Sequence, residues 1–275
     1  MRRVAQRRPQ ITFGIIGLGR IGRRVAARLA GEAAGPRLTA VLVRPDQKAT
    51  AEAIVGAAQV FTNLVQFIAC RPDVVVECAS REALHSYTGP VLAAGLDLIP
   101  LSLSALADPD FERRFFAAAT DGPGRLEISA GAMGSLDILA AAREETLSRV
   151  VFRATYPVAS WLGTAAETMI NLGQIAGRKA IYRGSVRDIA RLFPRHVNVA
   201  VGVALAGLGL DRTEAELIAD PALSQAMFEL DIAAGPGAVE LRVRGRATPA
   251  GADPVDYTTF SILRLLRRRQ ASVMI

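Results

Sequence analysis

Three glycines near the N-terminus have the spacing of a dinucleotide phosphate site. Gly17, Gly19 and Gly22 form a G-x-G-x-x-G pattern between the β-rich residues 11–16 and the helix-favouring residues 23–29. In that context the first glycine allows a tight turn, the second lets the backbone approach a pyrophosphate, and the third lets helix and strand pack closely. The N–H groups at the start of the helix then face the phosphates. The residues predicted to contact the dinucleotide here are Gly17, Gly19, Arg20, Ile21 and Gly22.

The next predicted strand, residues 38–43, is followed directly by Arg44 and then by Asp46. Sites specific for NAD usually place an acid at this strand end, about 20 residues after the glycines, whereas an arginine there accommodates the 2′-phosphate of NADP. Arg44 therefore favours NADP, or use of both dinucleotides, over strict NAD. An ordinary solvated arginine fits the same position, and the nearby Asp46 keeps NAD open.

Ala79 and Ser80 follow a third apolar run, residues 74–77. The carboxyl ends of parallel strands form the edge at which nucleotides bind, so we expect both residues to contact the cofactor. Cys78 precedes them, and we interpret it as a small buried residue because no base stands beside it to activate a thiol.

A parallel sheet is needed to position these residues, and the first half of the chain predicts one. Further strands are expected at residues 96–101 and 126–129, and helical segments at residues 81–85, 91–94 and 105–119. Strands that alternate with helices indicate a parallel sheet covered on both faces. We therefore predict an α/β fold, with a Rossmann-type doubly wound sheet in a dinucleotide-binding domain over residues 1–131.

The pattern changes after Leu136. Strands are predicted at residues 150–156, 215–219, 229–232 and 239–243, and helices at residues 185–192, 198–206 and 257–269. Alternating polar and apolar residues at 240–244 are typical of an antiparallel strand with one wet face. We predict a second α+β domain with a mostly antiparallel sheet, for substrate binding and dimerisation, over residues 132–254. The C-terminal helix within 255–275 is expected to pack back on the first domain.

Composition excludes several classes of protein. The 275 residues are 51% apolar, which excludes intrinsic disorder, and no apolar run approaches the roughly 20 residues of a membrane span. The charged start has no apolar stretch of a cleaved signal behind it. Cys70 and Cys78 are the only cysteines, too few for a disulfide framework or a metal site. We expect a cytoplasmic protein without a bound metal or a membrane partner.

The net charge of +7 raises the possibility of a nucleic-acid partner, but its distribution argues against one. Residues 1–10 hold four arginines and no acid, and so do residues 264–275, which leaves the body of the chain nearly neutral. Aromatic residues, which stack on bases, make up only 5% of the chain. We therefore expect no nucleic-acid partner.

Several further motifs, taken in order, resemble the L-aspartate dehydrogenases. They are Gly17-Leu-Gly-Arg-Ile-Gly22, Val75-Val-Glu-Cys-Ala79, Gly131-Ala-Met-Gly-Ser-Leu-Asp137, Ser160-Trp-Leu-Gly-Thr164, Gly184-Ser-Val-Arg187, Phe193-Pro-Arg-His-Val-Asn-Val-Ala200, Leu205-Ala-Gly-Leu-Gly209 and Ile218-Ala-Asp-Pro221. The resemblance implies oxidation of L-aspartate with NAD or NADP to iminosuccinate, which feeds NAD synthesis or hydrolyses to oxaloacetate and ammonia. It also implies a homodimer.

The resemblance further implies that Ala132 and Asn198 contact the cofactor. Ala132 lies in a glycine-flanked turn after a predicted strand, where its backbone can approach a nicotinamide. Asn198 carries both a donor and an acceptor, which suit a ribose or a carboxamide. An N-cap for the helix that begins near Val199 is the alternative role of Asn198, and the two roles are compatible.

Two positions depart from the family pattern. The family's catalytic histidine follows the Ala-Asp-Pro turn in an Asn-x-His motif, but here Ala226 and Phe228 occupy those two positions. Phenylalanine cannot exchange a proton. The stretch Ala154-Thr-Tyr-Pro157 also replaces an Arg-Lys pair that usually precedes the proline, and losing these cations should weaken recognition of a dicarboxylate.

His196 and Tyr156 are the candidate replacements in catalysis. His196 lies two residues before Asn198, and an imidazole is suited to acid–base work near neutral pH, although a surface loop histidine is the plain alternative. Tyr156 is a second candidate donor. Arg153 is a candidate to restore the lost charge, but strand alternation puts it on the opposite face from Tyr156. His85, the other histidine, is interpreted as a solvated residue at a helix end.

Three functions therefore compete. The first is an NAD(P)-dependent amino-acid dehydrogenase, with aspartate as its leading substrate. The second is a dehydrogenase or imine reductase for a less acidic substrate, which Phe228 and Tyr156 favour because they make the pocket more apolar. The third is a non-catalytic NAD(P)-binding homologue, which explains the missing histidine.

Overall fold

The computed structural model describes residues 9–134, 136–235, 237–245 and 257–274. The chain divides into two compact units. The first comprises Met1–Ser102, Arg113–Ser129 and Thr258–Ile275, and the second comprises Leu103–Glu112 and Ala130–Tyr257. Residues 103–112, which the sequence placed in the first domain, thus belong to the second unit, where the Leu106 and Ala107 carbonyls accept hydrogen bonds from Arg187.

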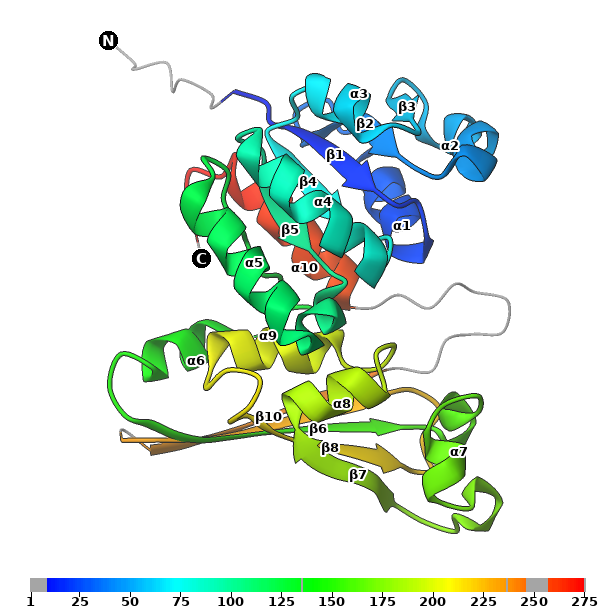
Figure 1. Cartoon of the computed structure of the whole chain (residues 1–275), viewed down its shortest axis with the longest axis vertical. Helices are drawn as coiled ribbons and strands as arrows, with labels where there is room; N and C mark the ends of the chain where they lie inside the picture. The colour runs from blue at the N-terminus through cyan, green and yellow to red at the C-terminus, as the bar shows by residue number, and fades with distance from the viewer. Residues whose placement is uncertain (1–8, 135, 236, 246–256, 275) are drawn as a thin grey trace. The chain divides into compact units, whose positions relative to one another are not determined.

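The first unit is built on a five-stranded parallel sheet in the order β3-β2-β1-β4-β5 (Figure 1). The strands are β1 (Thr12–Ile16), β2 (Arg37–Leu42), β3 (Gln59–Phe61), β4 (Val74–Glu77) and β5 (Asp97–Pro100). The helices of this part of the chain are α1 (Arg20–Leu29), α2 (Lys48–Val55), α3 (Leu64–Ala69), α4 (Arg81–Ala93), α5 (Pro109–Asp121) and α10 (Tyr257–Arg268). The predicted doubly wound, Rossmann-type sheet is confirmed.

Helix α10 lies beside strands that are far from it in sequence, because its apolar side chains share a hydrophobic core with β1 and α1. Phe13 and Ile15 on β1 are fully buried and pack with Val25 on α1 and with Ile262 and Leu266 on α10. Each fully buried leucine or isoleucine side chain contributes about 1.5–3 kcal/mol relative to an exposed one. Helices α1 and α10 therefore cover one face of the sheet together.

Four predicted elements of this half differ in the structure. Residues 126–129 form only an isolated bridge from Leu126 to Leu98 rather than a strand. Residues 81–85 and 91–94 lie in one helix, α4, which accommodates Pro90 in its last turn. The predicted helix over 105–119 is divided between a 3₁₀ turn, η2 (Leu103–Ala107), and α5, because Asp108 caps the start of α5 with its carboxylate.

The second unit contains a five-stranded sheet in the order β10-β9-β6-β8-β7. Its strands are β6 (Leu147–Tyr156), β7 (Lys179–Ser185), β8 (Glu214–Ala219), β9 (Met227–Ala234) and β10 (Gly237–Arg244), and only β6 and β8 run parallel. Its helices are α6 (Leu136–Ala142), α7 (Ala166–Met169), α8 (Val186–Leu192) and α9 (Asn198–Ala206), with 3₁₀ turns η3 (Val158–Trp161) and η4 (Leu172–Gln174). The predicted mostly antiparallel sheet is confirmed; β7 was not predicted.

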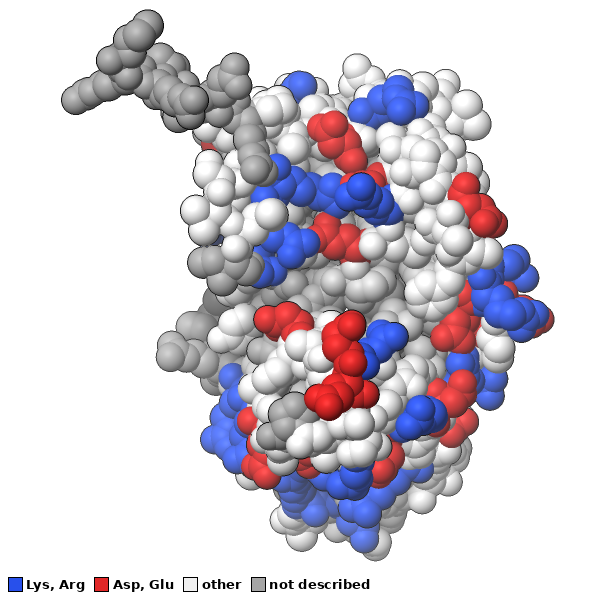
Figure 2. Space-filling view, turned by 90° about the vertical axis from the view of Figure 1, so that its left-hand side faces the viewer, with Lys and Arg blue, Asp and Glu red and all other residues white. Residues whose placement is uncertain are grey.

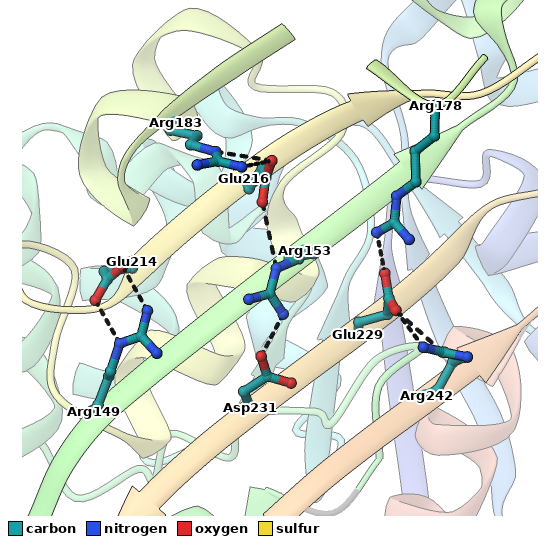
Figure 3. Close-up of polar contacts among 9 residues, drawn as sticks. All are labelled: Arg149, Arg153, Arg178, Arg183, Glu214, Glu216, Glu229, Asp231 and Arg242. Carbon is teal, nitrogen blue, oxygen red and sulfur yellow. Dashed lines mark hydrogen bonds and ion pairs between the residues drawn. The ribbon is translucent and has the colours of Figure 1, made fainter. Parts of the chain in front are cut away.

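The two faces of the second sheet differ in chemistry. Val150, Phe152 and Ala154 on β6 are buried on the face that α9 covers. The opposite face carries a network of ion pairs in which Arg153 lies between Glu216 and Asp231, as Figure 3 shows. Arg153 therefore lies on the face opposite Tyr156, as strand alternation predicts, and its charge is compensated there by two acids.

Acids pair with the arginines at the end of α10. Arg267 lies 2.6 Å from Glu32, Arg269 lies 2.5 Å from Asp97, and Arg268 also contacts Glu127. The positive charge predicted at the C-terminal end is therefore largely compensated within the unit, while the arginines at 1–8 lie outside the described residues. Basic and acidic side chains are interspersed on the face drawn in Figure 2. None of the helices in the described ranges is long and apolar enough to cross a membrane.

Candidate active site

A cleft of about 510 Å³ lies at the carboxyl ends of β1, β2 and β4 in the first unit. Strand order reverses between β1 and β4, and open α/β sheets bind ligands at that kind of switch point. Among the residues that line the cleft are five predicted cofactor contacts: Gly17, Gly19, Arg44, Ala79 and Ser80. Arg20, Ile21 and Gly22 form the first turn of α1 instead.

The space around the three glycines fits the roles that their spacing predicts. Gly17 has a φ of +87°, and a Cβ there would lie 2.5 Å from the Ala79 Cα atom. A Cβ on Gly22 would lie 2.5 Å from the Gly17 carbonyl oxygen. By contrast, no atom lies within 4 Å of the Cβ position of Gly19. Gly17 and Gly22 are therefore required for packing, whereas Gly19 leaves open space for a ligand.

The start of α1 offers hydrogen-bond donors to that space. Gly19 is the N-cap, no side chain caps the helix, and its first turn holds no acid. The first N–H groups of a helix have no intrahelical acceptor, so an anion is favoured here by both hydrogen bonds and the helix dipole. The pyrophosphate of a dinucleotide fits this donor set.

Arg44 lies two residues after β2, at the rim of the cleft. Its guanidinium lies 3.4 Å from the Asp46 carboxylate, and both side chains are about 70% exposed (73% and 68%). Such exposed pairs contribute only about 0–1 kcal/mol, so the contact does not prevent Arg44 from binding an anion. Arg44 lines the cleft together with Pro45 and Gln47.

The turn after β4 supplies one wall of the cleft. The Cys78 thiol lies 3.0 Å from the Gly17 carbonyl oxygen, to which it donates, and burial raises the pKa of this thiol. The interpretation of Cys78 as an unreactive packing residue fits this geometry. Ser80 is the N-cap of α4, where its hydroxyl accepts a hydrogen bond from the Ala83 N–H at 3.1 Å.

The other two predicted cofactor contacts, Ala132 and Asn198, belong to the second unit. Asn198 is the first residue of α9, with Val197 at the N-cap, so the suggested N-cap role of Asn198 is wrong. Its Oδ1 instead accepts a hydrogen bond from the Ser104 N–H at 2.8 Å, which leaves the two donors of Nδ2 outside that bond. Ala132 follows Gly131, whose φ is +56° and whose Cβ position lies 3.5 Å from Val199, the neighbour of Asn198.

Tyr156, His196 and Phe228 meet in an aromatic cluster of the second unit. The ring of Tyr156 contacts that of His196 edge-on, with centroids 5.0 Å apart, and that of Phe228 at 5.9 Å. Trp161, which is fully buried, stacks on His196 at 5.0 Å. Phe228 also stacks on Phe152 at 5.9 Å. We define the aromatic cluster as these five residues.

His196 has the chemistry of a general base within this cluster. Burial lowers the pKa of His196, the charge of Arg195 acts in the same direction, and a backbone hydrogen bond at Ser160 opposes them. The imidazole is therefore neutral at pH 7. Its Nδ1 atom is buried and has no hydrogen-bond partner among the described residues, and neither does the Trp161 indole nitrogen. Buried orphan atoms of this kind are rare in proteins and need an explanation.

Tyr156 is held differently. Its hydroxyl donates to the His196 backbone carbonyl at 3.0 Å, and burial raises the pKa of Tyr156. This bond uses the single donor of the phenol, so Tyr156 is better placed to orient the His196 segment than to protonate a substrate. His85 lies within α4 rather than at its end, exposed, 2.8 Å from Arg114.

Three residues of the two units were not predicted from sequence. Trp161, Arg187 and Glu77 all stood in motifs of the resemblance without an assigned role. The Arg187 guanidinium, on a residue that is 8% exposed, bonds Asp211 and Glu112 as well as two carbonyls. A charged residue inside an otherwise apolar run is the one signal that pointed to Glu77.

Comparison with known proteins agrees with both halves of the chain. Residues 137–269 match the family model of the aspartate dehydrogenase C-terminal domain, and residues 17–128 match the NAD-binding domain of homoserine dehydrogenase. The chain is 35% identical to L-aspartate dehydrogenase of Cupriavidus necator over 267 residues, which cover 95% of this chain and 98% of that protein.

Two further comparisons point the same way. The chain is 38% identical to L-aspartate dehydrogenase of Pseudomonas aeruginosa over 205 residues, covering 74% of this chain and 77% of that protein. The crystal structure of aspartate dehydrogenase from Thermotoga maritima superposes with a TM-score of 0.75 at 25% identity, over 97% of this chain and 100% of that one.

Proposed function

Since the chain belongs to the aspartate dehydrogenase family, we propose that it oxidises L-aspartate to iminosuccinate, which hydrolyses to oxaloacetate and ammonia. It is an NAD(P)-dependent dehydrogenase that acts on an amino donor. The observation that carries the proposal is the cleft of the first unit, where the open space at Gly19 meets an α1 terminus without a side-chain cap.

The residues of the chain bind, orient and exchange protons in this reaction. When bound, the nicotinamide accepts a hydride from the substrate α-carbon. We assign the first-turn N–H groups of α1 to the pyrophosphate and the Asn198 side chain to a ribose or carboxamide. His196, neutral at pH 7, takes up the proton that the substrate ammonium loses as the imine forms.

We further propose that NADP is preferred or used alongside NAD, because Arg44 and not Asp46 lines the cleft. A guanidinium binds a phosphate through paired, charge-assisted hydrogen bonds, which the ribose 2′-hydroxyl of NAD cannot provide.

A less acidic substrate is the second candidate, and the aromatic cluster is the observation that favours it. None of its five members is a cation, and Arg153, the nearest arginine along β6, is paired on the opposite face of the sheet. A dicarboxylate needs a cation for its second carboxylate, whereas a substrate with an apolar side chain is bound by aromatic rings.

Exchange of Phe228 for histidine separates these functions. If the scaffold is a dehydrogenase that lacks the family's base, Phe228→His should raise the rate of NADPH oxidation with oxaloacetate and ammonia by about 10²-fold, the usual contribution of a positioned base. Phe116→His adds a histidine at an exposed site of the first unit and should change nothing.

Other results of this experiment would favour one of the two alternative functions. If the Phe228→His variant binds NADPH but turns over neither oxaloacetate nor any apolar 2-oxo acid, a non-catalytic dinucleotide-binding protein is the better description. Turnover with apolar 2-oxo acids alone supports the second candidate.

A homodimer in the cytoplasm completes the proposal, and the family relationship supports both. Sedimentation equilibrium should give twice the mass of the 275-residue chain, and a monomer at micromolar concentration would contradict it.

A further inference from the structure

Glu77 places a carboxylate where its strand meets the cleft of the first unit. The residue ends β4 and is 1% exposed. Its Oε1 accepts hydrogen bonds from the Ala79 N–H (2.9 Å), the Ser80 N–H (3.2 Å) and the Ser102 hydroxyl (2.8 Å). Its Oε2 accepts from the N–H groups of Leu101 (3.2 Å) and Ser102 (3.0 Å). One carboxylate thus joins the turn after β4 to the turn after β5.

Every hydrogen-bond partner of this carboxylate is a donor, which limits the side chains that position 77 can hold. Only an acceptor with two oxygens satisfies the four N–H groups and one hydroxyl, whereas a glutamine would direct its own N–H groups at backbone donors. A buried charge is costly and persists where such hydrogen bonds compensate it. Burial raises the pKa of Glu77, and the bonds from Ser102, Ala79 and Leu101 oppose that rise.

The turn that Glu77 binds, residues 78–80, also packs directly against Gly17. The Ala79 Cα atom lies 2.5 Å from the Cβ position of Gly17, and the Cys78 thiol bonds the Gly17 carbonyl oxygen. Ala79 and Ser80 themselves line the cleft. A displacement of the turn by a few tenths of an ångström therefore reaches Gly17 directly, because no space separates the two backbones.

We propose that Glu77 is a positioning residue for the dinucleotide, which acts by fixing the 78–80 turn against Gly17. It does not touch the cofactor. This role rests on the cofactor site described above, and it goes beyond a contribution to folding because the two donors on Ala79 and Ser80 belong to the cleft wall.

The test compares Glu77→Gln with a control that loses a carboxylate of the same unit away from the cleft. Glu127 is such a residue: its side chain is 17% exposed, it pairs with Arg268 and Arg269, and it does not line the cleft. Dissociation constants for NADPH and NADH are measured by fluorescence titration of the full chain, and stability is measured by urea unfolding.

We expect Glu77→Gln to weaken binding of both dinucleotides at least tenfold, which corresponds to about 1.4 kcal/mol. Glu127→Gln should lower the unfolding midpoint while leaving both dissociation constants unchanged. In turnover, Glu77→Gln should raise the KM for the dinucleotide and spare kcat at saturation. Ser102→Ala, which removes one of the five donors, should weaken binding about threefold and serves if Glu77→Gln does not fold.

Other results would overturn the proposal. A folded Glu77→Gln protein with wild-type dissociation constants, or a Ser102→Ala protein that binds normally when Glu77→Gln does not fold, would remove the positioning role. Equal loss of binding in Glu127→Gln would reduce Glu77 to a stability residue. A wild-type protein that binds neither dinucleotide would instead overturn the cofactor site, and this role with it.

Discussion

At the scale of single residues, the chemistry of the second unit depends on how the aromatic rings surround His196. The imidazole is stacked on Trp161 and flanked by Tyr156, whose hydroxyl holds the His196 backbone. The burial that results lowers the pKa of His196. A neutral imidazole can accept a proton, which is the role that the proposed function gives to His196.

This assignment predicts the acid limb of the pH profile. Below its lowered pKa, and hence below the ordinary histidine value of about 6.5, His196 is protonated and cannot act as a base. We expect kcat/KM for amino-acid oxidation to fall by one power of ten per pH unit in that range, and His196→Ala to remove most of the rate at neutral pH. His85→Ala, at an exposed histidine, is the matched control.

The lowered pKa of His196 also makes the free energy of unfolding depend on pH. Because the folded-state pKa of His196 lies below its unfolded value, the neutral form contributes stability that is present above about pH 6.5 and is lost as the pH falls through the folded pKa. Urea unfolding of wild type and His196→Ala between pH 5 and 8 measures this. A difference that does not change with pH would show that His196 titrates as it does in the unfolded chain.

Arg44 gives a second prediction at this scale. If it binds the 2′-phosphate, Arg44→Ala should weaken NADPH binding about tenfold, as loss of a charge-assisted hydrogen bond does, and leave NADH binding within a factor of about two. Lys48→Ala removes a nearby exposed cation that does not line the cleft, and should spare both. Equal weakening of the two dinucleotides by Arg44→Ala would contradict the assignment.

At the scale of elements, Arg187 joins three segments of the second unit. From the first turn of α8 it bonds the carbonyls of η2, the Glu112 carboxylate and the Asp211 carboxylate. Its side chain is 9% exposed and that of Glu112 is 22% exposed, whereas Asp211 is 68% exposed, so Glu112 and the η2 carbonyls are the partners with little water to replace the guanidinium. Removing one member of a buried ion pair leaves the others without compensation, which is more costly than the pair itself is stabilising.

We therefore expect Arg187→Met to lower the free energy of unfolding by about 3 kcal/mol in urea titrations. Arg149→Met is the control, because Arg149 pairs with Glu214 on the exposed face of the second unit's sheet, where the two side chains are 58% and 56% exposed. Loss of this exposed pair should lower the free energy of unfolding by at most about 1 kcal/mol. Similar losses in the two variants would mean that burial of Arg187 contributes nothing.

Elements with strong local signals were predictable from sequence, and those fixed by distant contacts were not. The apolar runs of β1, β2 and β4 and the glycines between β1 and α1 are local, so both the parallel sheet and the phosphate site followed from them. The β7 sequence alternates weakly and forms a strand because β8 pairs with it. Residues 126–129 have strand-like composition but form only the isolated bridge from Leu126 to Leu98, where the Glu127 N–H bonds the Leu98 carbonyl.

The candidate site divides in the same way. Gly17, Gly19 and Gly22 could be assigned because their spacing alone demands a backbone geometry. The partners of Glu77 lie up to 25 residues away, and the rings that bury His196 come from separate segments, so no pattern of spacing contains them. Asn198 has helix-start chemistry in sequence, yet its Oδ1 bonds Ser104 from another segment of the chain.

At the scale of the whole molecule, the sequence joins a dinucleotide-binding unit to a second unit that carries the aromatic cluster. The first unit has the donors, the open space and the arginine that a dinucleotide needs. The second has a neutral histidine among aromatic rings. The charge of +7 does not alter this, because acids of the first unit pair with the C-terminal arginines of α10.

The central claim is that the chain is an active amino-acid dehydrogenase, and the consumption of reduced dinucleotide tests it most directly. Purified wild-type protein is given NADPH or NADH with ammonia and a panel of 2-oxo acids that includes oxaloacetate. We predict oxidation that requires both ammonia and a 2-oxo acid, with oxaloacetate as substrate and NADPH at least as effective as NADH. Tight binding of NADPH without oxidation by any member of the panel would contradict the claim.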